Sequence, residues 1–222
     1  MNYRLALALL PALLFVGACK SVNFDTNTEM RTETREIAAF NRIKTEGSLD
    51  LYVRVGPAQT IEVEAPANEI SLIATEVKNG ELRVYRKSGI TVEFSFKSSP
   101  GLNLNITVPT LNALTHEGSG DVFIEGLNGD SFELIHDGSG DIGLEGQCKT
   151  LSLTHEGSGD VNAKGLTCSD ATLKLDGSGE VRLSVSGSLD LSLNGSGDLD
   201  IWGTPRLAGF RQSGSGDLHI RN

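Results

Sequence analysis

Apolar residues recur at every second position on both sides of a repeated four-residue motif. The motif is Gly-Ser-Gly followed by Asp or Glu, and its spacing along the chain is nearly constant. Its copies begin at Gly118, Gly138, Gly157, Gly177, Gly195 and Gly214. Four residues before these glycines lie Leu114, Leu134, Leu153, Leu173, Leu191 and Phe210, and four residues after them lie Val122, Ile142, Val161, Val181, Leu199 and Leu218. Such alternation is typical of strands with one buried face, so each repeat is predicted to be a strand, a tight turn, a second strand and a second turn.

The regularity of the repeat predicts the fold class. Two short strands cannot bury their apolar side alone, so successive repeats must stack on one another. Each strand is then expected to pair in parallel with its counterpart in the next repeat, and such connections are nearly always right-handed. We therefore predict an all-β fold, a right-handed parallel β-helix or solenoid with rungs of about 19–20 residues and Gly-Ser-Gly-Asp turns. We expect glycine in these turns both for a positive φ and because stacked turns about 4.8 Å apart leave little room for side chains.

The preceding part of the chain follows the same pattern less regularly. The segment Glu46-Gly47-Ser48-Leu49-Asp50 copies the motif, with leucine in place of its second glycine. Asn79-Gly80 predicts a tight turn. Further alternating strands are predicted at Ile61–Glu64, Glu81–Tyr85, Thr91–Phe96 and Leu102–Val108. The solenoid domain is therefore expected to span residues 37–222.

The first residues are typical of a secretory signal. Arg4 precedes an apolar stretch, Leu5–Val16, which is short for a bilayer span. The tetrapeptide Val16-Gly17-Ala18-Cys19 resembles a bacterial lipobox, whose cysteine is lipidated and becomes the first residue of the mature protein. This resemblance implies a signal peptide over residues 1–18 and a lipid on Cys19 that holds the protein to a membrane.

The residues after the cysteine bear on location. Position 20 is Lys20, whereas an aspartate there favours retention in the inner membrane of lipoproteins of this kind. The outer membrane is therefore expected, with the domain facing the periplasm or the cell exterior. Residues 19–36 are polar and without apolar periodicity, so we expect a flexible tether between the lipid and the domain.

Three features together resemble the autotransporter adhesin head domain, or GIN domain, a bacterial family. They are the segment Ala-Phe-Asn-Arg-Ile at 39–43, the segment Leu104–Leu111 with its strand-Pro-Leu sequence, and the repeated Gly-Ser-Gly turns. The resemblance covers residues 37–222. It implies a β-superhelix similar in shape to pectin lyases, a role in adhesion and a trimeric assembly. The family has no shared catalytic set, so the resemblance supplies neither catalytic residues nor a cofactor.

Composition and charge narrow the range of partners. The chain has 26 glycines in 222 residues, well above the usual share, yet 38% of its residues are hydrophobic, which is ample for a packed core. The formal net charge is −10, concentrated in residues 111–222, where 17 acidic residues outnumber 7 basic ones. Because nucleic-acid affinity rests on Lys and Arg, we exclude nucleic acids as partners.

An acidic column accompanies the turns. One member follows each motif: Asp121, Asp141, Asp160, Glu180, Asp198 and Asp217. Stacked carboxylates attract cations, and calcium, a hard ion that takes several oxygens, is the natural candidate. The pattern departs from the calcium-binding repeat Gly-Gly-x-Gly-x-Asp, because its period is twice as long and its second turn lacks a matching acid. We therefore favour turn-capping aspartates on a solvated edge over calcium ligands.

Acid pairs also raise the alternative of a polysaccharide-active enzyme, using for instance Asp137 and Asp141 beside His136. Glycoside chemistry needs an acid and a base in different environments. A column repeated in every rung offers equal environments, which argues against catalysis. We therefore assign no catalytic residues and no cofactor.

Three of the four histidines, His116, His136 and His155, occupy the position two before the glycine of successive motifs. The same column continues as Leu175 and Leu193, which indicates an inward or half-buried direction. We interpret the histidines as a stacked ladder at the edge of the core, with a zinc or copper site as the alternative.

Cys148 and Cys168 both lie nine residues before a Gly-Ser-Gly motif, at the second turn of neighbouring repeats. Rung spacing places their α-carbons within disulfide range, and the compartment beyond the inner membrane is oxidising. We predict a disulfide across two rungs.

Two functions remain at this point. The first is a non-enzymatic binding or structural module, in which outward polar rows such as Asn103, Asn105 and Thr107 offer many weak contacts to glycans, to another cell-surface ligand or to further subunits of a homo-oligomer. The second is the polysaccharide-active enzyme.

Overall fold

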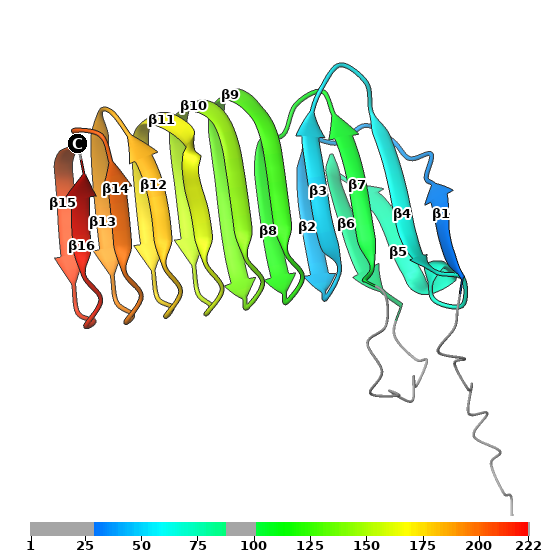
Figure 1. The fold of residues 1–222 in the computed structure, drawn as a ribbon. Helices are drawn as coiled ribbons and strands as arrows, with labels where there is room; N and C mark the ends of the chain where they lie inside the picture. Colours follow the sequence, from blue (N-terminus) through cyan, green and yellow to red (C-terminus); the bar gives the residue numbers. More distant parts are fainter. Residues whose placement is uncertain (1–28, 88–100, 222) are drawn as a thin grey trace, which may run out of the picture.

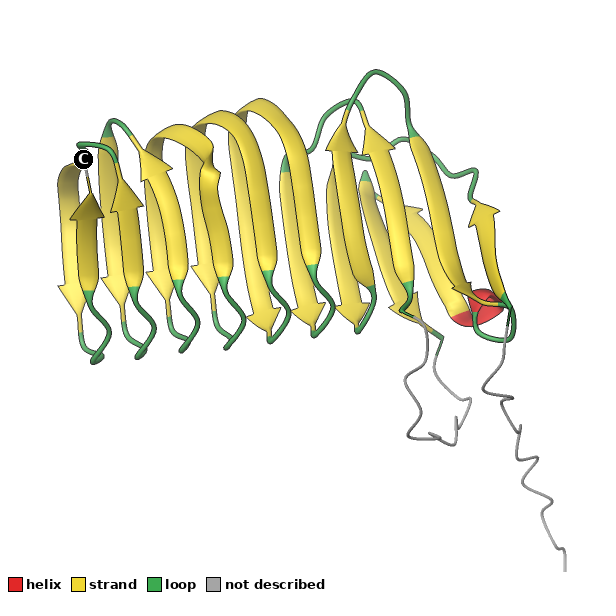
Figure 2. Cartoon of the chain, in the orientation of Figure 1, coloured by secondary structure: helices red, strands yellow, loops and turns green. Residues whose placement is uncertain are grey.

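The computed structural model of the chain describes residues 29–87 and 101–221. In this part of the chain, sixteen strands form one continuous sheet that coils into stacked rungs (Figures 1 and 2). The single helical turn among these residues is the 3-10 helix η1, Ile70–Leu72. The predicted all-β solenoid is therefore confirmed. The lipobox that ends at Cys19 and the predicted strand Thr91–Phe96 lie outside the described residues.

The regular part of the coil begins after residue 112. Its strands are β8 (Ala113–Gly118), β9 (Val122–Gly138), β10 (Ile142–His155), β11 (Val161–Leu175), β12 (Val181–Val185), β13 (Ser188–Leu193), β14 (Leu199–Trp202), β15 (Arg206–Gln212) and β16 (Leu218–Arg221). Neighbouring rungs pair in parallel, and the register places Leu134 beside Leu114 and Leu153, as the repeat predicts. The strands form two faces that meet at the Gly-Ser-Gly turns and at an opposite corner (Figure 1).

The opposite corner differs from the predicted second turn. In β9, β10 and β11 the strand continues around this corner without interruption, so one strand serves both faces. Gly126 and Gly146 bend the chain there with positive φ values of 77° and 136°. A glycine can adopt this conformation without strain, which lets the strand bend and stay paired with its neighbours.

The glycines of the Gly-Ser-Gly turns are needed for a different reason from the positive φ that we expected. From Gly118 onward, no glycine of these motifs has a positive φ. A methyl group built on Gly138 would instead overlap the carbonyl oxygen of Gly118, one rung away, and the same clash recurs at each later motif. Close stacking therefore accounts for these glycines by itself.

The first motif-containing rung consists of β2 (Arg42–Gly47) and β3 (Asp50–Val55). These strands pair in parallel with β8 and β9, which follow much later in the chain. The register pairs Gly47 with Gly118, so the imperfect copy of the motif stacks directly on the first perfect one. Residues 56–112 are therefore an insertion in the sequence, and its described residues, 56–87 and 101–112, lie on the other side of this rung.

The insertion caps one end of the solenoid. It contains β4 (Thr60–Pro66), β5 (Ile73–Lys78), β6 (Glu81–Arg86) and β7 (Asn103–Val108). Strands β6 and β7 continue the parallel stack beside β2 and β3, whereas β5 and β4 pair with them antiparallel. Our expectation that this region joins the parallel scheme was thus wrong for β4, which contains the predicted strand Ile61–Glu64, and β5 is a strand that we did not predict. The hairpin between β5 and β6 turns at Asn79-Gly80, as predicted, with φ values of 53° and 76°.

The folded part also starts earlier than predicted. Strand β1 (Met30–Thr34) lies in the segment expected to be a tether, and it pairs antiparallel with β4 as the outermost strand of the cap. None of its five residues is fully buried, so the strand needs no apolar alternation and its sequence resembles a polar tether. The tether boundary at residue 36 was therefore too late.

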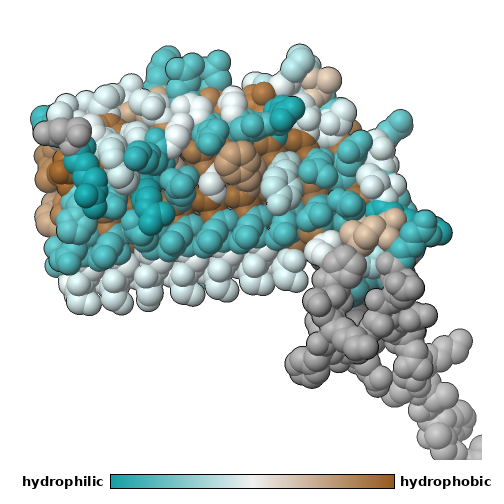
Figure 3. All heavy atoms as spheres, viewed as in Figure 1, coloured by the Kyte–Doolittle hydropathy of each residue, from teal (hydrophilic) through white to brown (hydrophobic). Residues whose placement is uncertain are grey.

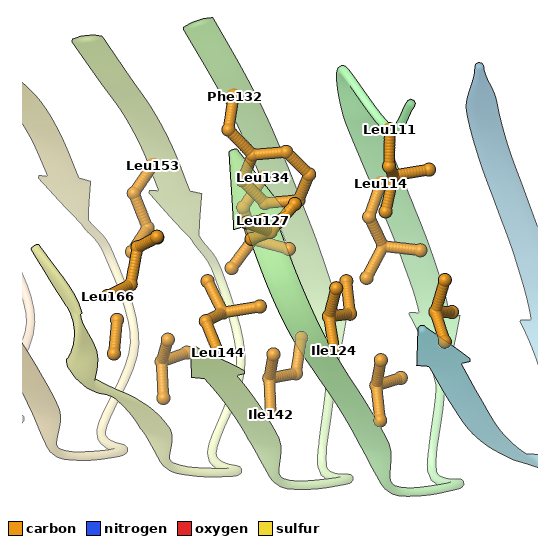
Figure 4. Close-up of a cluster of buried hydrophobic side chains, with 14 of the residues drawn as sticks. Leu111, Leu114, Ile124, Leu127, Phe132, Leu134, Ile142, Leu144, Leu153 and Leu166 are labelled. Carbon is orange, nitrogen blue, oxygen red and sulfur yellow. The ribbon is translucent and has the colours of Figure 1, made fainter. Parts of the chain in front are cut away.

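The core fills the narrow space between the two faces. Leu114, Leu134 and Leu153 point inward from one face and meet Ile124 and Leu144 from the other (Figure 4). All five side chains are buried. Because every rung supplies the same inward columns, burial is repeated along the axis, and the outer positions remain available for other roles.

Candidate functional site

The acidic column makes a backbone ladder along the Gly-Ser-Gly corner. The Asp121 Oδ1 accepts a hydrogen bond from the Asp141 N–H at 2.9 Å, and the Asp141 Oδ1 accepts one from the Asp160 N–H at 2.8 Å. The same contact joins Asp50 to Asp121, Asp160 to Glu180 and Asp198 to Asp217. Each of these carboxylates thus caps the turn of the next rung, which is the role that we favoured for the column.

Glu180 departs from the ladder. Its longer side chain forms an ion pair with Arg182 on β12. Among residues 29–87 and 101–221, no group of three or more His, Cys, Asp or Glu side chains is placed to hold a metal ion. The ladder therefore acts as a set of turn caps, and calcium coordination by these residues gains no further support.

The three histidines stack inside the corner. Ring centroids of His116 and His136 lie 5.5 Å apart, and those of His136 and His155 lie 4.8 Å apart. All three residues are buried, and the His116 Nδ1 is 2.7 Å from the Thr45 hydroxyl. In the part of the chain that the structure describes, neither ring nitrogen of His136 has a hydrogen-bond partner.

This environment favours neutral imidazoles. Burial lowers the pKa of all three histidines, and the neighbouring rings of His155 and His116 add to the effect at His136, whose pKa falls to about 4. The aspartates of the ladder oppose the lowering of the pKa, but burial is the larger effect. The column is thus an uncharged extension of the core, continued by Leu175 and Leu193 in the next rungs.

The residues considered for polysaccharide chemistry are not assembled into one site. Strand alternation turns His136 inward, where it is 0% exposed, and turns Asp137 outward to solvent. Asp141 is exposed as well, and its carboxylate is engaged by the Asp160 N–H. The imidazole therefore has no contact with a substrate that the carboxylates could reach.

The two cysteines face each other at the opposite corner. Cys148 on β10 is in register with Cys168 on β11, their α-carbons lie 4.6 Å apart, and a disulfide joins them. Both side chains are buried, so the bond lies at the edge of the core. The bond therefore cross-links two neighbouring rungs.

A feature that our sequence analysis missed lies on the outer face, over the junction between the cap and the regular rungs. Tyr52 on β3 and Phe123 on β9 are paired in register, and they are 48% and 37% exposed. They line an open hollow of about 490 Å³ together with Arg54, Thr60, Glu62, Asn105, Thr107 and Glu125. Figure 3 shows the face that carries β3, which is largely polar with a few apolar side chains at its surface.

A signal for this hollow exists in the sequence. Tyr52 stands between Leu51 and Val53, and Phe123 between Val122 and Ile124, so each aromatic ring occupies an outward position of an alternating strand. At most other outward positions the residue is polar. The polar rows that we did identify lie beside the rings, because Asn105 on β7 is in register with Tyr52.

The wall of the hollow is charged and hydrogen-bonding. The Arg54 guanidinium forms an ion pair with Glu125 on the neighbouring rung. Glu62 on β4 is in register with Asn105 and has no ion-pair partner among the described residues. The site thus combines two exposed aromatic rings with donors and acceptors at one end and along one side.

Comparison with known proteins agrees with the sequence motifs. Residues 39–205 match the family described as "Putative auto-transporter adhesin, head GIN domain". The chain belongs to this family. Our assignment from the Gly-Ser-Gly turns and the segment at 104–111 is therefore confirmed. No curated protein matches the sequence.

Solved structures share the fold of this GIN domain. A putative adhesin from Bacteroides fragilis superposes with a TM-score of 0.74 at 21% identity, over 90% of this chain and 100% of the other. A putative adhesin from Parabacteroides merdae gives 0.57 at 16% identity, over 88% and 98%. A protein from Parabacteroides distasonis described as a putative lipid binding protein gives 0.50 at 22% identity, also over 88% and 98%. At these identities the likeness establishes the fold.

Family membership indicates an adhesin-like role and a surface or extracellular location. In the described residues, no helix has the length and the apolar character that crossing a membrane requires.

Proposed function

We propose that this GIN domain is a non-enzymatic binding module of the bacterial surface, which attaches to its ligand through the outer face around Tyr52 and Phe123. The observation that carries the proposal is the break in regularity at this place. Every other outward column along the coil is mostly polar, whereas here two large aromatic side chains are held exposed beside a polar wall. Exposed aromatic rings next to fixed polar groups are typical of recognition surfaces.

The arrangement of the titratable residues supports a role without catalysis. The acidic ladder is used in capping turns, and the histidines are neutral and buried. The hollow contains two carboxylates, and one of them, Glu125, is held in an ion pair by Arg54. Glycoside chemistry needs two carboxyl groups that are free to act on the substrate, and Glu62 alone does not supply them.

The proposed anchor is a lipid on Cys19, which would hold the domain to the outer membrane. The motif Val16–Cys19 supports this assignment, and the first strand, β1, begins only at Met30, which leaves a spacer between lipid and domain. Changing Cys19 to Ala should leave the precursor uncleaved by the lipoprotein peptidase and shift the protein out of the detergent phase. A variant that still partitions with membranes at wild-type length would refute the lipid anchor.

The binding function is tested with the purified mature protein on immobilised glycans, on soluble polysaccharides and on whole cells. We expect binding without turnover. If the protein depolymerises a polysaccharide and replacement of one acidic residue, such as Asp137→Asn, abolishes this activity, the proposal is overturned in favour of the enzyme.

A second candidate function is assembly of subunits through the far end of the solenoid. The outer edges of β15 and β16 pair with no other strand among residues 29–87 and 101–221, and Leu207, Phe210 and Ile220 are exposed there. Unpaired strand edges with apolar side chains favour association. Sedimentation should show oligomers, and Phe210→Ser should weaken them. Ile135→Ser changes an exposed apolar residue elsewhere and should leave the oligomers unchanged. Monomers at all concentrations would exclude this candidate.

A further inference from the structure

We infer that the hollow between Tyr52 and Phe123 binds a neutral oligosaccharide of pyranose units. This inference rests on the proposed binding function and specifies the chemistry of its ligand. It starts from one row of outward residues that crosses the strands along the solenoid axis. Register places them in the order Glu62, Asn105, Tyr52, Phe123, Gly143 and Asn162.

The centre of this row is apolar. Tyr52 and Phe123 stand on neighbouring strands, which are about 4.8 Å apart in a sheet. A methyl group at Gly143 would lie 2.7 Å from the Phe123 ring, so the ring reaches over the glycine of the next rung. Packing on a glycine accounts for Phe123, since rings often cover strand glycines. It does not account for Tyr52, which covers no such position and is half exposed.

Polar residues border the rings at one end of the row and along one side of it. Asn105 supplies an amide beside Tyr52, and Thr107 and Thr60 supply hydroxyls in the adjoining row. The Arg54–Glu125 pair closes that side. A pyranose presents apolar C–H groups on its faces and hydroxyls around its rim, so its faces suit the rings and its hydroxyls suit this wall. A purely apolar ligand would leave the wall unpaired.

The charge of the hollow selects against acidic ligands. Arg54 is neutralised by Glu125, which leaves the carboxylate of Glu62 as the unbalanced charge. Uronic or sialic acids and phosphate groups would meet repulsion here, in a protein whose net charge is already −10. A neutral sugar meets no such penalty.

The shape of the row favours a chain of sugars. Beyond Phe123 the row continues over Gly143 and the small polar Asn162 before it reaches Arg182, so two rungs without a bulky side chain follow the rings. A pyranose is about as wide as the ~4.8 Å between strands, so consecutive sugars can lie over consecutive rungs. We therefore expect affinity to increase from a monosaccharide to a hexasaccharide.

The test is calorimetric titration of the mature full-length protein with cellohexaose, maltohexaose and N-acetylchitohexaose, and with hexagalacturonate as an acidic probe. At least one neutral probe should bind, and the acidic probe should not. Tyr52→Ala and Phe123→Ala should each weaken binding about tenfold. Ile135→Ala removes a side chain that is as exposed as Phe123, on the other face, and should leave binding unchanged.

The outcomes separate this inference from the proposed function. Neutral glycan binding that Tyr52→Ala and Phe123→Ala leave intact would overturn the inferred site while leaving the binding function in place. In a second outcome the protein binds cells, Tyr52→Ala abolishes this binding, and no neutral probe binds. This result would overturn the inferred ligand class, and the ligand would then be a lipid or a protein. Absence of binding to every glycan and to cells would overturn both. Unchanged circular dichroism and melting of the variants provide the folding control.

Discussion

The two corners of the solenoid both connect one face to the other, but their backbones turn in different ways. At the Gly-Ser-Gly corner the perfect motifs repeat nearly the same residues, and from Gly138 onward each motif glycine lies against the backbone of the matching glycine one rung away. At the opposite corner the rungs differ. Three strands run around it unbroken, Gly126 and Gly146 have positive φ, and a disulfide joins two rungs.

This difference explains how the repeat tolerates unequal lengths. The interval from Gly177 to Gly195 is shorter than that from Gly157 to Gly177, yet the positions that flank each motif stay in register. The register shifts fall near the opposite corner instead, between Leu144 and Gly146 on β10 and between Ala163 and Thr167 on β11. One corner is therefore limited by close contact, and the other absorbs extra residues as bulges.

The largest effect on stability is expected when glycine is replaced by alanine, and this replacement can be made at each corner. Gly138→Ala places a methyl group on the carbonyl oxygen of Gly118, so the stacked turns must move apart, and we expect a loss of at least about 3 kcal/mol in the free energy of unfolding. Gly129→Ala at the opposite corner meets nothing closer than 3.9 Å and should be neutral or slightly stabilising. Urea denaturation measures both, and equal effects would refute the distinction between the corners.

The second test removes the cross-link of the opposite corner. The Cys148→Ala and Cys168→Ala double variant should lose about 3 kcal/mol of stability, because the bond closes a loop in the unfolded chain. Urea denaturation of wild type with and without reductant should reproduce the difference. Quantitative thiol labelling of unfolded mature protein that finds both cysteines free would show that the bond is absent in the isolated protein.

The third test measures how stability depends on pH, which reports on the buried histidines beside the Gly-Ser-Gly corner. The pKa of His136 is about 4 in the folded protein and about 6.5 in the unfolded chain, so protons bind the unfolded state first as the pH falls. Stability is therefore complete above pH 6.5 and declines toward pH 4, by about 3 kcal/mol for His136. The declines from His116 and His155 have the same sign.

Leucine provides the matched variant for this test, because Leu175 and Leu193 occupy the same column in later rungs. His136→Leu should flatten the decline in melting temperature between pH 6.5 and pH 4. A variant with the same acid sensitivity as wild type would show that other groups are responsible.

The smallest effect is expected at the acidic ladder. Asp141→Ala removes the acceptor for the Asp160 N–H and should lower stability by about 1 kcal/mol. Asp141→Asn keeps an acceptor oxygen and relieves repulsion along the column, so it should be close to neutral in urea denaturation. Stabilisation of wild type by millimolar calcium, lost in Asp141→Asn, would instead favour the calcium interpretation of the column.

Parts of the candidate site could be predicted and parts could not. The inward direction of His136 followed from the leucines that continue its column, and the pairing of Cys148 with Cys168 follows the rung register. The hollow was missed because its two rings, Tyr52 and Phe123, lie far apart in the chain. Each ring alone resembles an ordinary exposed aromatic residue, and only the pairing of β3 with β9 makes them neighbours.

The sequence by itself determined the rung, its turn and its inward columns. Each rung contacts a near copy of itself, so the same steric requirement for glycine and the same need for apolar side chains recur at every motif. Only the tertiary structure decided how the stack is capped and which outward side chains meet. Antiparallel pairing at the sheet edges positions β1, β4 and β5. Parallel pairing with β8 and β9, which follow the insertion in the chain, positions β2 and β3. Backbone hydrogen bonds at such edges accept many sequences, so local alternation does not specify the partner, its direction or its register.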